Sequence, residues 1–167
     1  MENRKQLIIV RHGKSSWKYE KISDIDRHLK ERGIHDAYTM AERLKESNLS
    51  PDLIISSPAA RALHTAMIFT RTLNHPLAQV QMQDIFYNGD DEDVLDVIRQ
   101  TPENISTLLI FGHNPTFTDL ANRFLTQELD NLSTAGMAFL EFKAETWRVI
   151  EKERVVDEWT DSPGKKH

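Results

Sequence analysis

Cysteine is absent from the 167 residues of the chain, which excludes disulfide bonds, thiolate metal sites and thiol nucleophiles. The sequence also lacks a run of the ~18–20 apolar residues that a membrane-spanning helix requires. Its first residues, MENRKQL, contain no apolar core of a signal peptide. The formal net charge is −5, and no basic run occurs before the terminal GKKH, so the footprint of a nucleic-acid-binding protein is missing. We therefore expect a cytoplasmic protein that binds neither a membrane nor nucleic acid.

The composition and length are those of one folded domain. Hydrophobic residues make up 39% and charged residues 28% of the sequence, a balance that distinguishes a globular chain from a disordered one. A chain of this size buries a core without disulfides or metals. No internal repeat or change of composition marks a linker. We predict a single domain over residues 1–160 and a disordered tail over residues 161–167.

Short apolar segments alternate with longer segments of helical spacing. Strands that alternate with helices form βαβ units, which build a mostly parallel sheet with helices on both faces. The sequence thus predicts an α/β fold, a three-layer α/β/α sandwich. The expected strands are 7–10, 52–56, 78–82 and 106–111, and the expected helical stripes are Ile34, Ala37, Ala41 and Leu44, then Val94, Leu95 and Ile98, then Phe117, Leu120, Ala121, Phe124 and Leu125.

The last third of the chain has a different pattern. GMAFLEFKA (136–144) and WRVIEKERVV (147–156) predict two antiparallel strands, joined by a tight turn near Glu145 and added to the edge of the sheet. Such an edge either pairs with a second copy or is blunted by its Lys and Glu residues. The sequence therefore leaves a monomer and a weak dimer open.

Polar residues follow three of the expected strands directly. RHG (11–13) follows the first strand, SSP (56–58) ends the second, and GHNP (112–115) follows the fourth. In open α/β sheets, ligands bind outside the carboxyl ends of the strands. Ser57 and Asn114 are also expected to cap helices whose first residue is the following proline. Helix starts present free N–H groups, which favour an anion.

Two arginines and two histidines are expected to converge at this edge: Arg11, His12, Arg61 and His113. The guanidinium fork matches the oxygens of a phosphate group. A neutral imidazole is nucleophilic, and its ordinary pKa of about 6.5 leaves it largely neutral at pH 7. One histidine can then attack phosphorus while the arginines and the second histidine, as an imidazolium, neutralise oxygen charge. Gly13 is expected to supply backbone freedom next to the nucleophile.

Three motifs in this order, VRHGKS, SSPAARALHTA and GHNP, resemble the histidine phosphatase superfamily, also called phosphoglycerate mutase-like. The resemblance covers roughly residues 7–125. It implies that His12 is the nucleophile that becomes transiently phosphorylated. It also implies that Arg11 and Arg61 hold the phosphate and that His113 is a second, hydrogen-bonding histidine.

A fourth segment, DIDRHLKERGIHDA (24–37), resembles the small bacterial protein-phosphohistidine phosphatases of that superfamily. In those proteins an acidic residue is followed by Arg, Pro and Leu, so His28 stands where proline is common. The resemblance implies that Arg27 is an additional phosphate or substrate contact. As a charged helix start, the same arginine has a second, purely structural interpretation.

The general acid is the position where the chain departs from the family pattern. Many relatives supply a glutamate after the third strand, but QMQDIFYNGDDED (81–93) has none before Glu92. Asp84 is the positional match and is our candidate acid. Asp90 and Asp91 are expected to cap a helix instead. A phosphohistidine substrate tolerates a weak acid in the enzyme, since the leaving imidazole can bring its own proton.

The sequence thus predicts a metal-independent phosphatase without a cofactor, which acts through a phosphohistidine intermediate on a phosphorylated protein. The other histidines lack the spacing of a metal site. Two alternatives stay open: a broad-specificity phosphatase of small phosphomonoesters, and a non-catalytic module that binds phosphate or a phosphoprotein. A mutase is less favoured, because the short chain leaves little room for loops that enclose a sugar- or glycerate-like substrate.

Overall fold

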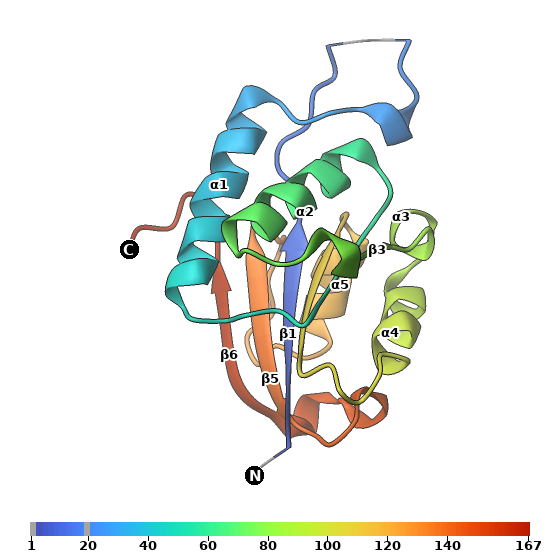
Figure 1. Ribbon diagram of the computed structural model, residues 1–167, viewed down its shortest axis with the longest axis vertical. Helices are drawn as coiled ribbons and strands as arrows, with labels where there is room; N and C mark the ends of the chain where they lie inside the picture. The colour runs from blue at the N-terminus through green and yellow to red at the C-terminus, as the bar shows by residue number, and fades with distance from the viewer. Residues whose placement is uncertain (1–2, 19–20) are drawn as a thin grey trace.

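The computed structural model describes residues 3–18 and 21–167. In this part of the chain, six strands form one sheet in the order β3-β2-β4-β1-β5-β6 (Figure 1). The four strands from β3 to β1 are parallel, and β5 and β6 are antiparallel to their neighbours. The strands are β1 (Arg4–Arg11), β2 (Leu53–Ser56), β3 (Val80–Met82), β4 (Thr107–Gly112), β5 (Met137–Lys143) and β6 (Val155–Asp161).

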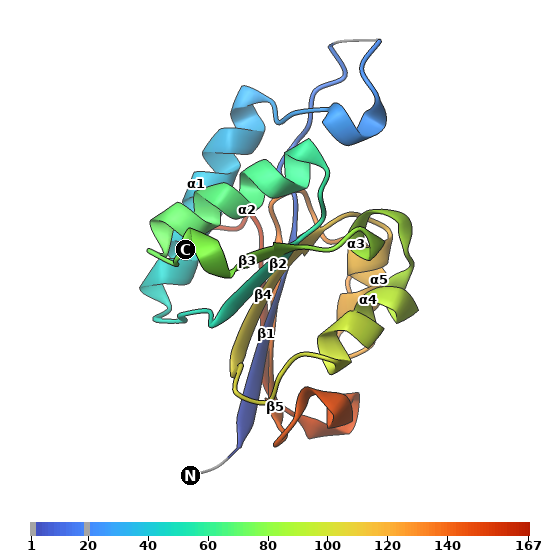
Figure 2. The same ribbon diagram turned by 45° about the vertical axis from the view of Figure 1, so that its right-hand side comes forward.

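Helices cover both faces of the sheet, as Figure 2 shows, so the α/β sandwich predicted from the sequence is confirmed. Leu7 and Ile9 of β1 pack in one core with α4 and α5, while Ile8 and Val10 pack in another with α1 and α2. All four are fully buried, which is why the strand is an unbroken apolar run. The helices are α1 (Glu31–Glu46), α2 (Ala60–Thr72), α3 (Ile85–Asn88), α4 (Asp91–Arg99) and α5 (Thr116–Asn122).

Short 3-10 segments account for the differences from the predicted elements. The strand expected at 78–82 begins only at Val80, because η2 (Leu77–Gln79) precedes it. The described part of the chain has three further 3-10 segments, η1 (Asp24–Asp26), η3 (Trp147–Val149) and η4 (Lys152–Arg154). The predicted helical stripes lie on α1, α4 and α5, except that Phe124 and Leu125 are buried just beyond the end of α5.

The tight turn predicted near Glu145 is wrong. Residues 144–154 connect β5 to β6 through η3 and η4, and β6 begins at Val155. The physical reason is burial of Trp147, which is fully enclosed and donates its Nε1–H to the carbonyl of Ile105 at 2.7 Å. Ile150 is buried in the same core. These two side chains hold the connection beneath α4 rather than in the sheet.

The end of the chain extends the sheet further than expected. Asp161, assigned to a disordered tail from the sequence, is the last residue of β6 and is buried. Its carboxylate accepts a hydrogen bond from Arg43 of α1 at 3.2 Å and lies 2.9 Å from His167 Nε2. In the described residues, no helix combines the length and apolar character needed to cross a membrane.

Candidate active site

Five of the six residues predicted for the site line one pocket of about 380 Å³ at the carboxyl ends of the parallel strands. Arg11 is the last residue of β1 and His12 follows it. Arg61 lies in the first turn of α2, and His113 follows β4. Arg27 reaches the pocket from the segment between η1 and α1. Segments far apart in the sequence meet here because parallel strands end at the same edge.

His12 is buried and has a defined tautomer. Its Nδ1 lies 2.6 Å from the carbonyl oxygen of Gly13, so Nδ1 carries the proton and Nε2 keeps the lone pair. Burial lowers the pKa of His12 to about 4, and the charges of Arg61 and Arg11 add to this effect against the hydrogen bond to Gly13. At neutral pH the residue is therefore an uncharged imidazole with Nε2 available for attack.

His113 lies beside His12, with 5.1 Å between the ring centroids. Its Nε2 is 2.8 Å from Ser57 Oγ, and that oxygen accepts the N–H of Ala59 at 3.2 Å. The Ser57 hydroxyl keeps its hydrogen for a bond to Nε2, and in the tautomer that accepts this bond Nδ1 of His113 is an N–H donor. Burial, followed by the charge of His12 and Arg61, lowers the pKa of His113 to about 3. At neutral pH the ligand-free site therefore holds His113 as a neutral ring, whereas the sequence predicted an imidazolium during the reaction.

Three buried nitrogens of the pocket residues have no hydrogen-bond partner among the described residues: Arg11 Nε, Arg61 Nε and His113 Nδ1. Their side chains are held by other atoms. Arg11 donates from Nη1 to the carbonyl of Leu132 at 3.0 Å, and Arg61 donates from Nη1 and Nη2 to Asp24. A buried donor without an acceptor costs about 1–3 kcal/mol. Three of them in one pocket favour a ligand with several acceptor oxygens.

Asp24 is the functional candidate that the sequence analysis missed. Its Oδ2 accepts from Tyr87 at 2.7 Å and from Arg61 at 3.0 Å, and its Oδ1 accepts from Arg27 at 3.0 Å. These hydrogen bonds, led by that from Tyr87, hold the pKa of Asp24 well below its usual range. Asp24 stands at the start of the quoted segment DIDRHLKERG. The acidic residue of the family motif is Asp26, so the signal for Asp24 in the sequence was its spacing of three residues from Arg27.

The helix starts at the pocket differ from those predicted. α2 begins at Ala60 with Ala59 as its N-cap, and α5 begins at Thr116. Ser57 is used by His113 as well as by Ala59 N–H. The side chain of Asn114 accepts the N–H of Thr118 at 3.1 Å and donates to the carbonyl of Leu132 at 2.8 Å. Ser57 and Asn114, which were predicted as helix caps, therefore hold residues of the pocket wall.

Gly13 is required by packing. A Cβ atom at Gly13 would lie 2.7 Å from the carbonyl oxygen of Gly33 in the first turn of α1. None of the glycines in the described chain has a positive φ, so the backbone freedom expected from the sequence is not used. Gly13 N–H also donates to Thr65 Oγ1 at 3.1 Å. The residue after the candidate nucleophile thus ties β1 to both α1 and α2.

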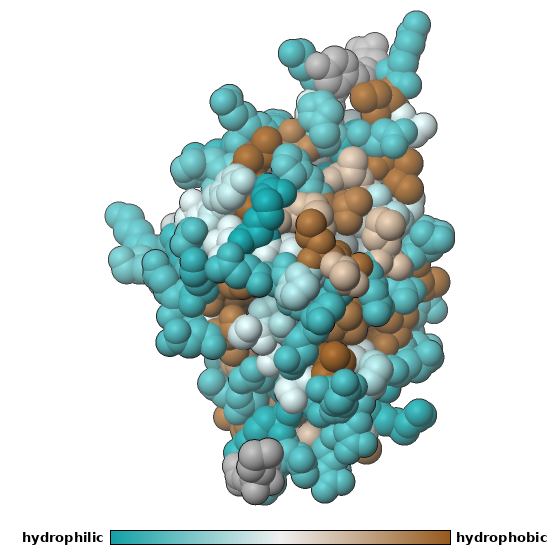
Figure 3. All heavy atoms as spheres, viewed as in Figure 1, coloured by the Kyte–Doolittle hydropathy of each residue, from teal (hydrophilic) through white to brown (hydrophobic). Residues whose placement is uncertain are grey.

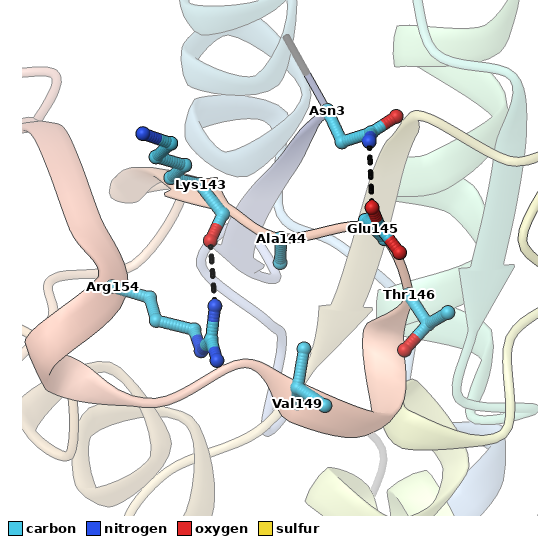
Figure 4. Close-up of a pocket in the computed structure, with 7 residues that line it drawn as sticks. All are labelled: Asn3, Lys143, Ala144, Glu145, Thr146, Val149 and Arg154. Atoms are coloured by element: carbon cyan, nitrogen blue, oxygen red, sulfur yellow. Dashed lines mark hydrogen bonds between the residues drawn. The ribbon is translucent and has the colours of Figure 1, made fainter.

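A second pocket, of about 500 Å³, lies at the opposite edge of the sheet (Figure 4). Asn3 precedes β1 there, and Lys143 ends β5. Figure 4 shows two hydrogen bonds between its residues: Asn3 donates to Glu145 at 3.2 Å, and Arg154 donates to the carbonyl of Lys143 at 3.3 Å. None of the described residues that line this pocket has a buried nitrogen without a hydrogen-bond partner, in contrast to the first pocket.

Residues 7–86 match the family model described as "Histidine phosphatase superfamily (branch 1)". A Mycobacterium tuberculosis protein without an assigned function is 32% identical over 114 residues, which cover 67% of each chain. The chain belongs to the histidine phosphatase superfamily. Part of it, 65 residues, is also 38% identical to the 2,3-bisphosphoglycerate-dependent phosphoglycerate mutase of Cutibacterium acnes, of which it covers 26%.

Solved structures of the superfamily have the same fold. SixA from Agrobacterium tumefaciens is 26% identical, with a TM-score of 0.77 over 93% of this chain and 97% of that one. The structure named "protein histidine phosphatase SixA complexed with tungstate" is 23% identical, with a TM-score of 0.78 over 95% and 97% of the two chains. This second likeness concerns the fold alone.

Asp84, the acid predicted from the superfamily pattern, is not brought to the pocket. It is exposed, and it precedes α3, where its backbone carbonyl accepts the N–H of Tyr87 at 2.9 Å. Tyr87 is the residue of α3 that faces the site, with its ring 5.5 Å from that of His113. Asp90 caps α4 in a reciprocal pair with Asp93, as the sequence predicted.

Proposed function

We propose that the protein is a phosphatase that removes the phosphoryl group from phosphohistidine on a protein, through a phosphorylated His12. One observation carries this proposal: a buried, uncharged His12 with its Nε2 lone pair available lies beside three buried nitrogens without partners, which belong to Arg11, Arg61 and His113. A phosphoryl group supplies the acceptors for Arg11, Arg61 and His113. The structurally similar SixA from Agrobacterium tumefaciens is named as a phosphohistidine phosphatase, which supports the choice of substrate.

In the first step, Nε2 of His12 attacks phosphorus, and the P–N bond to the substrate imidazole breaks on the opposite side. The electron pair of that bond goes to the departing nitrogen. The Gly13 carbonyl accepts the Nδ1–H and so stabilises the positive charge that the His12 ring gains. Arg11, Arg61 and His113 bind the equatorial oxygens through the open donors.

In the second step, the oxygen of a water molecule attacks phosphorus and the P–Nε2 bond breaks. Its electron pair returns to His12; one proton of the water stays on the attacking oxygen, and the other passes to another oxygen of the released phosphate. The two guanidinium groups neutralise the phosphoryl oxygens in both steps. Metal-independent turnover is part of this proposal.

Phosphohistidine is favoured over an alkyl ester by the chemistry of the leaving group. None of the described residues that line the pocket has a carboxyl group. Asp24 is the neighbouring carboxylate, but its lowered pKa keeps it ionised and unable to donate a proton. A phosphohistidine ring that carries a proton on its other nitrogen leaves as neutral imidazole without an enzyme acid. An alkoxide would need one.

The proposal is tested by rapid-quench labelling with phosphohistidine peptide as the donor, followed by mass spectrometry of the peptide that contains His12. We expect an acid-labile, base-stable phosphate on His12, which is lost in His12→Ala. The matched control is His35→Ala, because His35 is an exposed histidine on α1. Phosphate release from an alkyl ester should be at least about 100-fold slower, the usual contribution of a positioned general acid.

Absence of label and of turnover with every donor would sink the proposal. In that case the non-catalytic binding module of the sequence analysis takes its place. Label on His12 with equal rates for the peptide and the alkyl ester would retain the intermediate and overturn the substrate choice in favour of small phosphomonoesters.

A further inference from the structure

Trp17 is an exposed aromatic residue at the mouth of the pocket. It lies five positions after His12, lines the same pocket and has 73% of its surface exposed. One face of its indole is covered: the guanidinium carbon of Arg27 lies 3.5 Å from the ring centroid. Arg27 is the one described residue recorded over the ring, and with so large an exposed fraction the indole is open to solvent at the mouth.

The backing arginine is itself held in place. Arg27 donates from Nη1 to Ser15 Oγ at 2.7 Å and from Nε to Asp24 Oδ1 at 3.0 Å. Its side chain is 10% exposed. An antiparallel bridge between Ser15 and Leu29 joins the two segments that carry Trp17 and Arg27. The indole therefore rests on a fixed, buried support rather than on a mobile surface chain.

The direction of the reaction brings the leaving group to this ring. His12 and the open donors of Arg11 and Arg61 lie buried in the pocket, so they hold the phosphoryl group there. In an in-line transfer the leaving group departs on the side opposite the nucleophile, which is toward the mouth. An imidazole leaving group at the mouth of the pocket would therefore lie against the face of the Trp17 indole. Aromatic rings stack favourably, and a protonated imidazole adds attraction to the electron-rich face of Trp.

We propose that Trp17 is the leaving-group subsite, where its indole stacks on the imidazole of the phosphohistidine and sets the preference for that substrate. The inference rests on the proposed function and deepens it. Lys14 and Lys30 also line the pocket. These lysines attract any anionic phosphoryl donor, whether or not its leaving group is an aromatic ring. Trp17 is therefore the residue that would select a donor with a ring.

Two phosphoryl donors that both contain a P–N bond distinguish stacking by Trp17 from a general effect of Trp17 on the pocket. Phosphohistidine and phosphoramidate both transfer phosphorus from nitrogen, but only the first has a ring. We expect Trp17→Ala to lower kcat/KM for phosphohistidine about threefold to tenfold, the range of an aromatic contact. For phosphoramidate we expect a change of less than about twofold. Trp17→Phe should restore most of the phosphohistidine rate.

Leu77→Ala is the matched control, because Leu77 is 63% exposed and lies in η2, outside the pocket. Equal losses with both donors would overturn the inference, since they would show that Trp17 acts only by holding Arg27. Unchanged rates with both donors would overturn it as well. No turnover of either donor by the wild-type protein would instead overturn the proposed function, and the subsite with it.

Discussion

At the scale of single residues, burial decides the protonation state of the candidate nucleophile. The pKa of His12 is lowered from 6.5 to about 4, so between these values the unfolded chain binds a proton that the folded chain does not. The free energy of unfolding therefore falls as the pH falls through this window. A neutral nucleophile at physiological pH is thus obtained at the expense of stability in acid.

We expect wild type to lose on the order of 3 kcal/mol more unfolding free energy than His12→Asn between pH 6.5 and pH 4. Urea denaturation at several pH values measures this difference. Asp24 does not contribute to the difference between wild type and His12→Asn in this pH range, because its lowered pKa affects stability below the ordinary carboxyl pKa of 3.8. Parallel pH profiles for the two proteins would show that His12 titrates normally.

Asp24 is a positioning residue in this arrangement. It holds Arg61 and Arg27 through its carboxylate and receives the hydroxyl of Tyr87. Asp24→Asn keeps the size of the side chain but removes the charge that orients both guanidinium groups. We expect kcat/KM to fall about tenfold, through a higher KM, which is the scale of a lost charge-assisted contact.

Tyr87→Phe is the companion variant, since it removes one hydrogen bond to Asp24 without altering any charge. It should cost only about threefold in kcat/KM. A general-acid role for Asp24 predicts a different result. In that case Asp24→Asn would lower kcat with KM unchanged, and the loss would be greatest for alkyl esters.

At the scale of elements, the end of β1 is positioned by its contact with α1. Gly13 and Gly33 approach so closely that a Cβ on Gly13 would lie 2.7 Å from a backbone oxygen. Gly13→Ala should therefore push the segment after His12 away from α1, with a stability loss of about 1–3 kcal/mol and a loss of activity of at least about tenfold. Gly164→Ala serves as the control, because a Cβ there meets nothing within 4 Å. Denaturant midpoints measure the loss of stability, and initial rates measure the loss of activity. A fully active Gly13→Ala variant would refute the packing argument.

The elements that could be predicted from sequence are those whose pattern is set by local burial. Strand β1 is an apolar run with RHG at its end, so its burial and the residues at its tip followed from the pattern alone. Trp147 shows the opposite case. Its segment alternates like a strand, but a tertiary hydrogen bond to Ile105 and burial against α4 override that preference.

The same reasoning explains the differences at the site. Arg11, His12, Arg61 and His113 converge because strand ends and a helix start place them. Arg27 lies three residues after Asp24, but the other two partners, Arg61 and Tyr87, come from α2 and α3, and no spacing in the sequence links them to Asp24. For Asp84, position in the chain matched the superfamily pattern, but the short α3 presents Tyr87 to the site instead.

At the scale of the whole molecule, the charge is unevenly distributed. The net charge is −5, but the candidate active site is lined by five cationic residues: Arg11, Lys14, Arg27, Lys30 and Arg61. A cationic mouth on an acidic protein attracts an anionic partner at that face and repels it elsewhere. Such steering is screened by salt over about 10 Å at 0.1 M ionic strength.

We therefore expect kcat/KM for a phosphohistidine protein with acidic surface near the phosphate to fall steeply with ionic strength. The double variant Lys14→Ala/Lys30→Ala should lower kcat/KM at low salt and flatten this dependence, while kcat changes little, because both lysines are exposed on the rim. Lys143→Ala/Lys152→Ala removes the same charge at the opposite edge of the sheet and is the control. Steady-state rates between about 20 and 300 mM salt make the comparison, a range that shortens the screening length severalfold. Equal slopes for the two double variants would mean that net charge, and not the cationic mouth, governs the encounter.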